Sequence, residues 1–305
     1  MGWGQLSGAK APQRGQDRAV PCCARVALPY QFQHVSILGT DNDKGRTKAV
    51  KDRLKDKAII VIGSGTGIGA ATVRRLAAEG ARVCAADINL PAAQAVAADI
   101  AAAGGDAFAV YIDIADEASV NAAVATAVER LGGLDGAHVN AADLRVIFQD
   151  SNALDVDMEV FDRTLTVNLR GHLLCTRAVL PHLLQRGSGA IVYTTSTAAD
   201  AAEAVRPCYA ASKSGLNALM RHVASRWGRE GITANCVAPG FVITAEMEAG
   251  GQVPRDFLDY ALTQTPSTRL GRSEDIAAMV ALLLSEDGRW INGQVCNVSG
   301  GSLMR

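Results

Sequence analysis

The fold is decided by the stretch Ala58-Ile59-Ile60-Val61-Ile62-Gly63-Ser64-Gly65-Thr66-Gly67-Ile68-Gly69. Its first five residues form a short apolar run that is typical of a buried strand. The glycines allow positive φ angles and a close backbone approach, and a helix beginning at Gly67 offers free N–H groups and a positive dipole end. This order predicts a phosphate-binding turn, with an ordinary tight turn as the alternative. The expected phosphate contacts are Gly63, Gly67, Ile68 and Gly69.

Asp87 follows the second expected strand, about 20 residues after the glycine loop. A carboxylate at this place can accept hydrogen bonds from an adenosine ribose and would repel a 2′-phosphate. The residue before Gly67 is Thr66, so no basic side chain is there to pair with such a phosphate. Both points favour NAD over NADP, and a solvated loop aspartate is the alternative interpretation.

From residue 53 onward, apolar runs alternate with segments of helical spacing. The expected strands are Ala58–Ile62, Arg82–Ala86, Ala107–Ile112, Leu134–Val139, Ala190–Thr194, Thr233–Ala238 and Gln294–Val298. The expected helices are Gly67–Glu79, Pro91–Ala103, Asp116–Leu131, about Val156–Arg186, Pro207–Glu230 and Ser273–Ser285. Buried strands alternating with helices predict an α/β fold whose parallel sheet is covered on both faces. Right-handed crossovers then give a doubly wound sheet, the Rossmann fold, as a single domain over residues 53–305.

Residues 1–52 differ from the rest, since they mix Gly, Gln, Arg, Lys and Asp without a sustained period. They predict an N-terminal extension, which could be a disordered tail, a poor transit peptide or sequence upstream of the true start, and the first and last of these are favoured. Across all 305 residues the net charge is −1 and 49% are apolar, which provides for a large core and argues against a nucleic-acid partner. No apolar run approaches the ~18 to 20 residues that a membrane span needs.

The chain has seven scattered cysteines, none in a CxxC pair and none in a cluster with histidine at zinc-ligand spacing. We therefore expect no metal site. An odd, scattered set fits a reducing cytoplasm. Cys208 directly precedes Tyr209, and packing is the more ordinary role for it than lining a site.

Tyr209-Ala210-Ala211-Ser212-Lys213 places a phenol and an ammonium one helical turn apart. A tyrosine is a useful general acid near neutral pH only if its phenol is made more acidic, and an adjacent ammonium acts in that direction. A pKa change from about 10 to about 7 takes roughly 4 kcal/mol. The spacing alone fits an exposed surface pair equally well, so the interpretation depends on the other motifs.

Those motifs occur together and in a fixed order. They are Gly63-x3-Gly67-x-Gly69, Asn140-Ala141-Ala142, Asn168, Ser196, Tyr209-x3-Lys213 and Pro239-Gly240-x3-Thr244. Together they resemble the short-chain dehydrogenase/reductase family of the classical type, over about residues 53–301. Ile62, Val139 and Ala142 depart from the residues common in that family, and none of these departures removes a catalytic group.

The resemblance implies a role for each matching position. Ser196 would bind the substrate oxygen, Tyr209 would transfer the proton, and Lys213 would hold the nicotinamide ribose and acidify Tyr209. Asn168 would position a water in a proton relay through Lys213. The remaining implied cofactor contacts are Asp113 at the adenine with Ile114 beside it, Asn140 at the sheet edge, and Val242 and Thr244 at the nicotinamide.

Ketone reduction leaves negative charge on oxygen, and donors from Ser196 and Tyr209 would stabilise that charge as it develops. The leading hypothesis is thus an NAD(H)-dependent oxidoreductase that interconverts a small-molecule secondary alcohol and a ketone. A 3-oxoacyl-thioester reductase using NADPH and a non-enzymatic dinucleotide-binding sensor or scaffold are the alternatives.

The segment at about residues 241–270 is long and contains Gly250-Gly251 and Pro254, which predicts a mobile lid over the substrate. Alanines within residues 198–208 suggest a roomy, apolar pocket in which Glu203 and Arg206 are the polar exceptions. The resemblance further implies a homo-oligomer, a tetramer or dimer, in which the two longest helices could pack across an interface.

Overall fold

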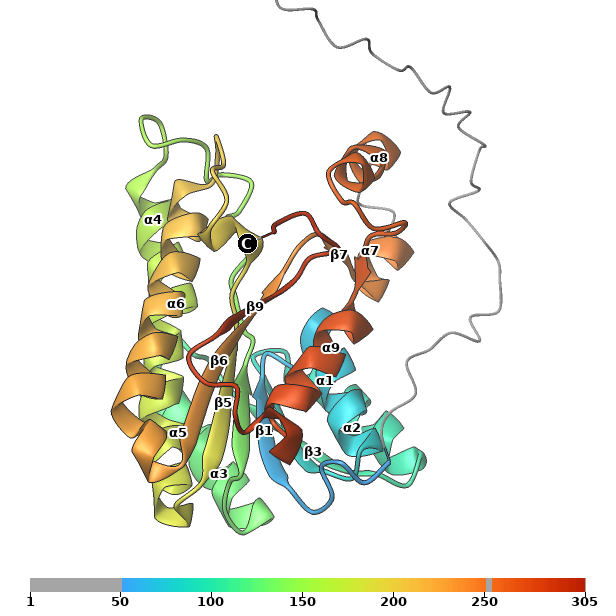
Figure 1. Cartoon of the computed structure of the whole chain (residues 1–305), viewed down its shortest axis with the longest axis vertical. Coiled ribbons are helices and arrows are strands. Elements are labelled where there is room, and N and C mark those ends of the chain that lie inside the picture. The colour runs from blue at the N-terminus through green and yellow to red at the C-terminus, as the bar shows by residue number, and fades with distance from the viewer. Residues whose placement is uncertain (1–50, 251–253, 305) are drawn as a thin grey trace, which may run out of the picture. The chain divides into compact units, whose positions relative to one another are not determined.

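A seven-stranded, wholly parallel sheet forms the centre of the fold (Figure 1). The structure is a computed structural model that describes residues 51–250 and 254–304. The strand order is β3-β2-β1-β4-β5-β6-β9. The strands are β1 (Ala58–Ile62), β2 (Arg82–Asp87), β3 (Asp106–Tyr111), β4 (Gly136–Val139), β5 (Gly189–Thr194), β6 (Ile232–Pro239) and β9 (Val295–Val298).

Helices cover both faces of this sheet. One face carries α1 (Gly67–Ala78), α2 (Leu90–Ala102) and α9 (Ser273–Leu283). The other carries α3 (Glu117–Leu131), α5 (His172–Arg186) and α6 (Pro207–Trp227), with α4 (Met158–Leu165) leading into α5. Short helical turns are η2 (Thr197–Ala199), η3 (Gly228–Glu230) and η4 (Glu286–Gly288). The predicted doubly wound α/β fold is confirmed.

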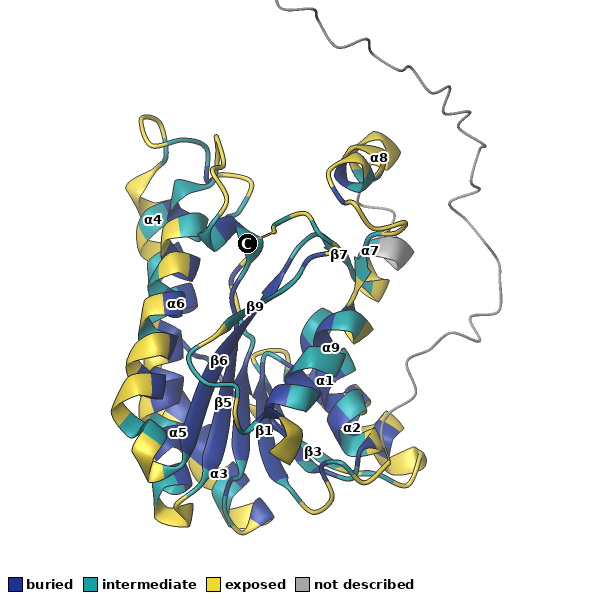
Figure 2. Cartoon of the chain, viewed as in Figure 1, coloured by how far each residue is buried: buried dark blue, intermediate teal, exposed yellow. Residues whose placement is uncertain are grey.

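Strand β1 shows why the apolar run folds as it does. Successive side chains of a strand point to opposite faces, and all five of these are fully buried (Figure 2). Ile60 and Ile62 belong to the core under α3, α5 and α6, whereas Ile59 and Val61 belong to the core under α1, α2 and α9. A strand buried on both faces therefore needs continuous rather than alternating apolar residues.

The strand order reverses direction between β1 and β4. From β1 the chain proceeds to β2 and β3 on one side, and from β4 to β5 and β6 on the other. The loops after β1 and β4 therefore lie at the switch point of the sheet, beyond the carboxyl ends of the strands, which is where folds of this kind bind ligands.

Two predictions about the helices need correction. The single helix expected at about Val156–Arg186 is α4 and α5 joined by a six-residue π-helix, η1 (Thr166–Gly171). The helix expected to end at Glu230 ends at Trp227, because the last turn tightens into the 3-10 turn η3. Hydrophobic periodicity does not distinguish these windings, since the chain continues in the same direction.

The segment at residues 241–270 contains secondary structure that the sequence did not predict. It holds α7 (Ala245–Gly250), α8 (Arg255–Thr263) and β7 (Val242–Ile243), which pairs with β8 (Gly271–Arg272). These elements lie beyond the carboxyl ends of the strands (Figure 1). The predicted N-terminal extension, residues 1–52, lies outside the described residues except for Lys51 and Asp52.

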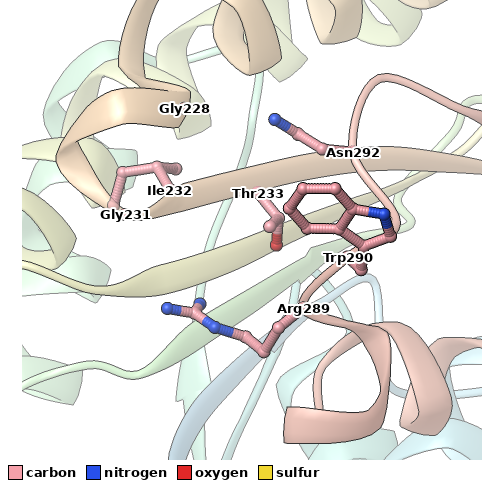
Figure 3. Close-up of a pocket in the computed structure, with 7 residues that line it drawn as sticks. All are labelled: Gly228, Gly231, Ile232, Thr233, Arg289, Trp290 and Asn292. Carbon is pink, nitrogen blue, oxygen red and sulfur yellow. The ribbon is translucent and has the colours of Figure 1, made fainter.

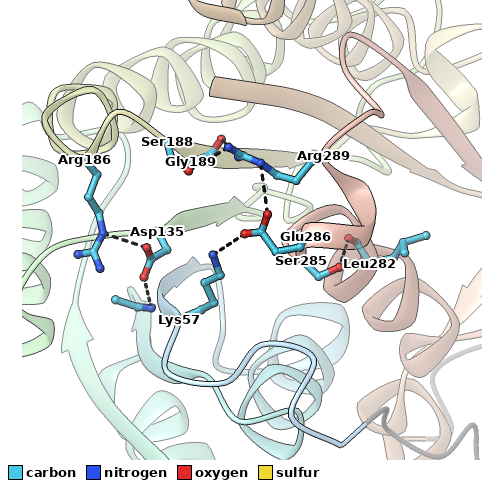
Figure 4. A network of polar contacts seen from close by, with 10 residues as sticks. Lys57, Asp135, Arg186, Ser188, Gly189, Leu282, Ser285, Glu286 and Arg289 are labelled. Carbon is cyan, nitrogen blue, oxygen red and sulfur yellow. Dashed lines mark hydrogen bonds and ion pairs between the residues drawn. The ribbon is translucent and has the colours of Figure 1, made fainter. Parts of the chain in front are cut away.

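Polar contacts tie the opposite, amino-terminal edge of the sheet together (Figure 4). Asp135 accepts a hydrogen bond from the Ala58 amide at 2.7 Å and an ion pair from Arg186 at 2.9 Å. Arg289 donates to the Ser188 hydroxyl at 2.9 Å. These contacts join the starts of β1, β4 and β5 and therefore stabilise the amino-terminal edge of the sheet. The candidate functional residues lie at the opposite, carboxyl-terminal edge.

Candidate active site

The four predicted catalytic residues all come from elements that meet at the carboxyl edge of the sheet. Tyr209 and Lys213 lie in the first two turns of α6, Ser196 follows β5, and Asn168 lies in η1. The structure brings Ser196 and Tyr209 into hydrogen-bond contact. The Lys213 ammonium lies 5.7 Å from the centroid of the Tyr209 ring. Residues far apart in the sequence therefore form one group.

Lys213 is buried among the strand ends, with 1% of its surface exposed. Its Nζ donates a hydrogen bond of 2.9 Å to the backbone oxygen of Thr194. Burial lowers the pKa of the ammonium to about 8, since the charged form is deprived of water. The lysine therefore loses its proton within the range of mildly alkaline pH.

Tyr209 lies partly buried in the first turn of α6. Burial raises the pKa of its phenol, while the hydrogen bond with Ser196 and the positive charge of Arg206 act to lower it. The Lys213 ammonium donates its hydrogen bond to the Thr194 carbonyl and lies 5.7 Å from the centroid of the Tyr209 ring. The phenol thus holds its proton at neutral pH, which is the state that a general acid needs.

Asn168 is fully buried in the π-helix η1. Its Oδ1 accepts a 2.9 Å hydrogen bond from the Asp143 amide, in the loop after β4. Its Nδ2 is buried without a partner among the described residues. π-Helical turns are rare and are found mostly at functional sites, so the winding of η1 is consistent with a selected orientation of this amide.

Thr194, which sequence reasoning did not single out, joins the two halves of the site. Its backbone oxygen holds Lys213, and its hydroxyl donates to Asn140 Oδ1 at 2.8 Å. Asn140 Nδ2 in turn donates to the Gly63 carbonyl at 2.8 Å. His138 Nε2 also contacts the Thr194 hydroxyl at 2.8 Å, and burial lowers the pKa of that imidazole to about 3, which keeps it neutral. The sequence does place Thr194 at the end of a predicted strand and two residues before Ser196, and this position indicates that Thr194 lies near the site.

The backbone of the glycine loop is packed too closely against its neighbours to admit side chains at Gly63 or Gly69. Gly63 and Gly67 have φ angles of 85° and 52°, which favour glycine. A Cβ at Gly63 would lie 2.6 Å from the Ala141 backbone, and one at Gly69 would lie 1.8 Å from the Gly63 carbonyl. Any larger residue would therefore close the space between the loop, helix α1 and the β4 loop.

Asp87 accepts two backbone hydrogen bonds at the end of β2. Its Oδ2 accepts from the Gly65 amide and its Oδ1 from the Asn89 amide, both at 2.7 Å. Each carboxylate oxygen can accept a second bond, so a ribose hydroxyl still fits. The carboxylate thus lies against the glycine loop, where the sequence predicted it, and is held there by the loop itself.

Asp113 and Ile114 follow β3 and differ in exposure. Asp113 is partly buried, and its Oδ1 accepts the Ala115 amide at 2.9 Å. Ile114 is buried in the core with α3 and α5. Its side chain packs inside the protein, so any contact of Ile114 with a cofactor is left to its backbone.

Thr244 and Glu246 place the start of α7 against the glycine loop. A Cβ at Gly67 would lie 3.2 Å from Thr244 Cγ2, and the Gly67 amide donates to Glu246 Oε1 at 3.3 Å. Burial acts to raise the pKa of Glu246, but hydrogen bonds from its own amide, from Thr244 and from Gly67 hold it below its ordinary value. An anionic carboxylate therefore lies at the start of α1, where a phosphate is expected. Val242 is partly buried in β7, two residues before Thr244.

Two other features lie away from this group. A surface pocket is lined by Gly228, Ile232, Thr233 and Trp290 at the amino end of β6 (Figure 3). It is at the opposite edge of the sheet and shares no residue with the site. Within residues 51–250 and 254–304, no three His, Cys, Asp or Glu side chains gather as metal ligands, and no helix is long and apolar enough to cross a bilayer.

The Rossmann fold, the glycine loop and the Ser196–Tyr209–Lys213 group together define a dinucleotide-dependent oxidoreductase. The family model described as Enoyl-(Acyl carrier protein) reductase matches residues 62–302. A probable short-chain type dehydrogenase/reductase of Bradyrhizobium diazoefficiens is 39% identical over 251 residues, covering 82% of this chain and 89% of the relative. The levodione reductase of Leifsonia aquatica is 33% identical, covering 84% of this chain and 97% of the relative.

Among solved structures, a 7α-hydroxysteroid dehydrogenase complexed with NADH and 7-oxo glycochenodeoxycholic acid is similar, with a TM-score of 0.76 and 32% identity. The match covers 83% of this chain and 96% of that one. The chain belongs to the short-chain dehydrogenase/reductase family and is an NAD(P)-dependent oxidoreductase.

Proposed function

We propose that this protein is an NAD(H)-dependent oxidoreductase that interconverts a secondary alcohol and a ketone, with Tyr209 as general acid and base. The observation that carries the proposal is the contact of Tyr209 with Ser196 beside a buried lysine. When bound, the dinucleotide supplies or accepts the hydride. The relatives named levodione reductase and 7α-hydroxysteroid dehydrogenase support the alcohol and ketone chemistry.

In the proposed reduction, the hydroxyls of Ser196 and Tyr209 donate hydrogen bonds to the ketone oxygen. These donors stabilise the negative charge that develops on that oxygen, and Tyr209 then gives up its proton. Lys213 holds a ribose and stabilises the phenolate that remains, since its ammonium lies on the tyrosine ring face. Asn168 orders a water that returns a proton through Lys213, which its buried, unpartnered Nδ2 supports.

The cofactor contacts belong to the same proposal. The pyrophosphate is bound by the glycine loop, through Gly63, Gly67, Ile68 and Gly69. Asp87 accepts hydrogen bonds from the adenosine ribose. Asp113 and the backbone of Ile114 bind the adenine. Asn140 holds the loop edge, and Val242 and Thr244 bind the carboxamide. Asp87 favours NAD, because its carboxylate lies against the Gly65 amide where a 2′-phosphate would approach. The NADH in the similar steroid dehydrogenase structure supports the same choice.

The remaining parts of the proposal concern the surroundings of the site. Residues 241–270 act as a lid, since α7, α8 and β7 lie beyond the strand ends. The protein works as a dimer or tetramer on a small alcohol or ketone. A reducing, cytoplasmic compartment is supported by the five described cysteines, all of which are free thiols.

A 3-oxoacyl-thioester reductase that uses NADPH is the second candidate. The description of the matching family model, which names an acyl carrier protein, favours it. Turnover of acetoacetyl thioesters with a preference for NADPH would select this candidate over the first. A sensor or scaffold that only binds the dinucleotide would have no use for the assembled Ser196–Tyr209 contact.

The test compares wild type, Tyr209→Phe and Tyr193→Phe with NADH and a panel of ketones. Tyr193 is a matched control, because its phenol is buried in β5 and bonds Thr176 at 2.7 Å. Tyr209→Phe is expected to lower kcat by about 10²- to 10⁴-fold while NADH still binds. Tyr193→Phe should keep kcat near that of wild type. Equal rates for Tyr209→Phe and wild type would overturn the assignment.

A further inference from the structure

A buried carboxylate from another part of the chain caps the helix that carries Tyr209. Asp150 lies in the loop between β4 and α4, with 3% of its surface exposed. Its Oδ2 accepts the Tyr209 amide at 2.8 Å, and its Oδ1 accepts the Cys208 amide at 3.2 Å. The backbone oxygen of Asp150 also accepts the Arg206 amide at 3.0 Å.

Helix α6 needs such a partner because its own start offers none. The first N–H groups of a helix have no acceptor within the helix, and here the residue at the cap position is Arg206, whose side chain makes no capping bond. Arg206 also has a φ of 66°, which an arginine adopts only when neighbouring groups hold it. Pro207 has no N–H, so the first two amides that need acceptors are those of Cys208 and Tyr209.

The Asp150 carboxylate also interacts with the thiol of Cys208. Burial and the hydrogen bond to Asp150 raise the pKa of Cys208 to about 11. The thiol beside Tyr209 therefore stays protonated at neutral pH. The carboxylate itself is stabilised by the positive end of the α6 dipole.

We infer that Asp150 is a positioning residue that fixes Tyr209 in the first turn of α6. This inference rests on the proposed function of Tyr209. First turns fray easily, and a phenol displaced by about 1 Å from its substrate oxygen loses much of its effect. Lys213 and Ser196 have anchors of their own, the Thr194 carbonyl and the Ala198 amide. Loss of Asp150 would therefore move Tyr209 relative to two groups that stay in place.

The test uses the full chain with Asp150→Asn, Asp150→Ala and the control Asp157→Ala. Asp157 is also a helix cap, accepting the Glu159 amide at 2.9 Å, but it is exposed and caps α4. Asparagine keeps the shape of aspartate and one acceptor, so Asp150→Asn decides the outcome if Asp150→Ala does not fold. We measure kcat and KM for the ketone, the Kd for NADH, and hydrogen exchange of the amides at residues 206–210.

We expect kcat to fall about tenfold in Asp150→Asn and about a hundredfold in Asp150→Ala, with the Kd for NADH changed less than about twofold. The kinetic isotope effect with deuterated NADH should rise as the chemical step becomes limiting. Protection from exchange should be lost at Cys208 and Tyr209, and Asp157→Ala should show none of these changes.

Unchanged kcat in the folded Asp150 variants would overturn the inference, as would a loss of NADH affinity equal to the loss of kcat. A wild type that turns over no ketone would instead refute the proposed function. In that case hydrogen exchange at the Cys208 and Tyr209 amides would still test whether Asp150 holds this turn. Unchanged protection of these amides in the Asp150 variants would refute the positioning role of Asp150.

Discussion

Replacement of Lys213 by methionine should make the protein more stable at neutral pH and inactive. The pKa of Lys213 is lowered from 10.5 to about 8 because the ammonium is buried. That difference corresponds to about 3 kcal/mol, by which the fold disfavours the charged lysine below pH 8. Methionine removes this cost but leaves the Thr194 carbonyl without its donor, a loss of about 1–2 kcal/mol. We therefore expect Lys213→Met to be about 1–2 kcal/mol more stable at pH 7.

The sign of the effect should change with pH. Between the folded pKa of about 8 and the unfolded value of 10.5, the unfolded chain holds the proton that the folded chain has released. The unfolding free energy of the wild type therefore rises with pH in this window, relative to the methionine variant. The advantage of Lys213→Met should shrink by about 2.5 kcal/mol between pH 7 and pH 10 and become a disadvantage.

Urea unfolding at fixed protomer concentration, at pH 7, 8.5 and 10, measures this difference. Comparison with the wild type at each pH cancels the titration of the buried cysteines, which both proteins share. Lys55→Met, at an exposed position, should differ from wild type by an amount that does not vary with pH. The reasoning would be refuted if the difference in unfolding free energy between the wild type and Lys213→Met stayed constant from pH 7 to pH 10.

Two further predictions concern cofactor binding. Glu246→Gln should tighten NADH binding about fivefold, because the carboxylate at the Gly67 amide repels the pyrophosphate. The control Asp256→Asn, on α8, should leave the Kd for NADH unchanged. Fluorescence titration with NADH measures the Kd of both variants. Asp87→Ser should improve the Kd for NADPH relative to NADH by at least about tenfold, since it removes a charge beside the 2′-phosphate position. A ratio of the two Kd values that stays at its wild-type value would contradict the role of Asp87.

The sequence predicted the sheet because its signal is local. Five continuous apolar residues at Ala58–Ile62, followed by a glycine loop, are typical of a buried strand that leads into a tight turn. The structure places these five residues in β1, at the centre of the sheet. The π-helix around Asn168 was not predictable in this way. An extra residue in one helical turn leaves the hydrophobic pattern almost unchanged, although it rotates the Asn168 amide toward the β4 loop.

The contacts of the site were hidden for a related reason. Asp150 and Tyr209 are 59 residues apart, and Glu246 is 179 residues from Gly67. An aspartate in a polar loop has no periodicity that marks it as a cap for a distant helix. The lowered pKa of Lys213 likewise depends on its burial against the end of β5, which the residue spacing along one helix cannot report.

The arrangement around Thr194 explains why the fold tolerates a buried ammonium at all. Its carbonyl faces Lys213, while its hydroxyl continues through Asn140 to the Gly63 carbonyl of the phosphate loop. The same residue therefore satisfies the lysine and fixes the loop that would carry the dinucleotide phosphates. Because both groups are tied to one strand end, the end of β5 sets the distance between the lysine and the glycine loop. The buried ammonium of Lys213 lowers the stability of the fold, and it lies where the proposed chemistry needs a charge in a fixed place.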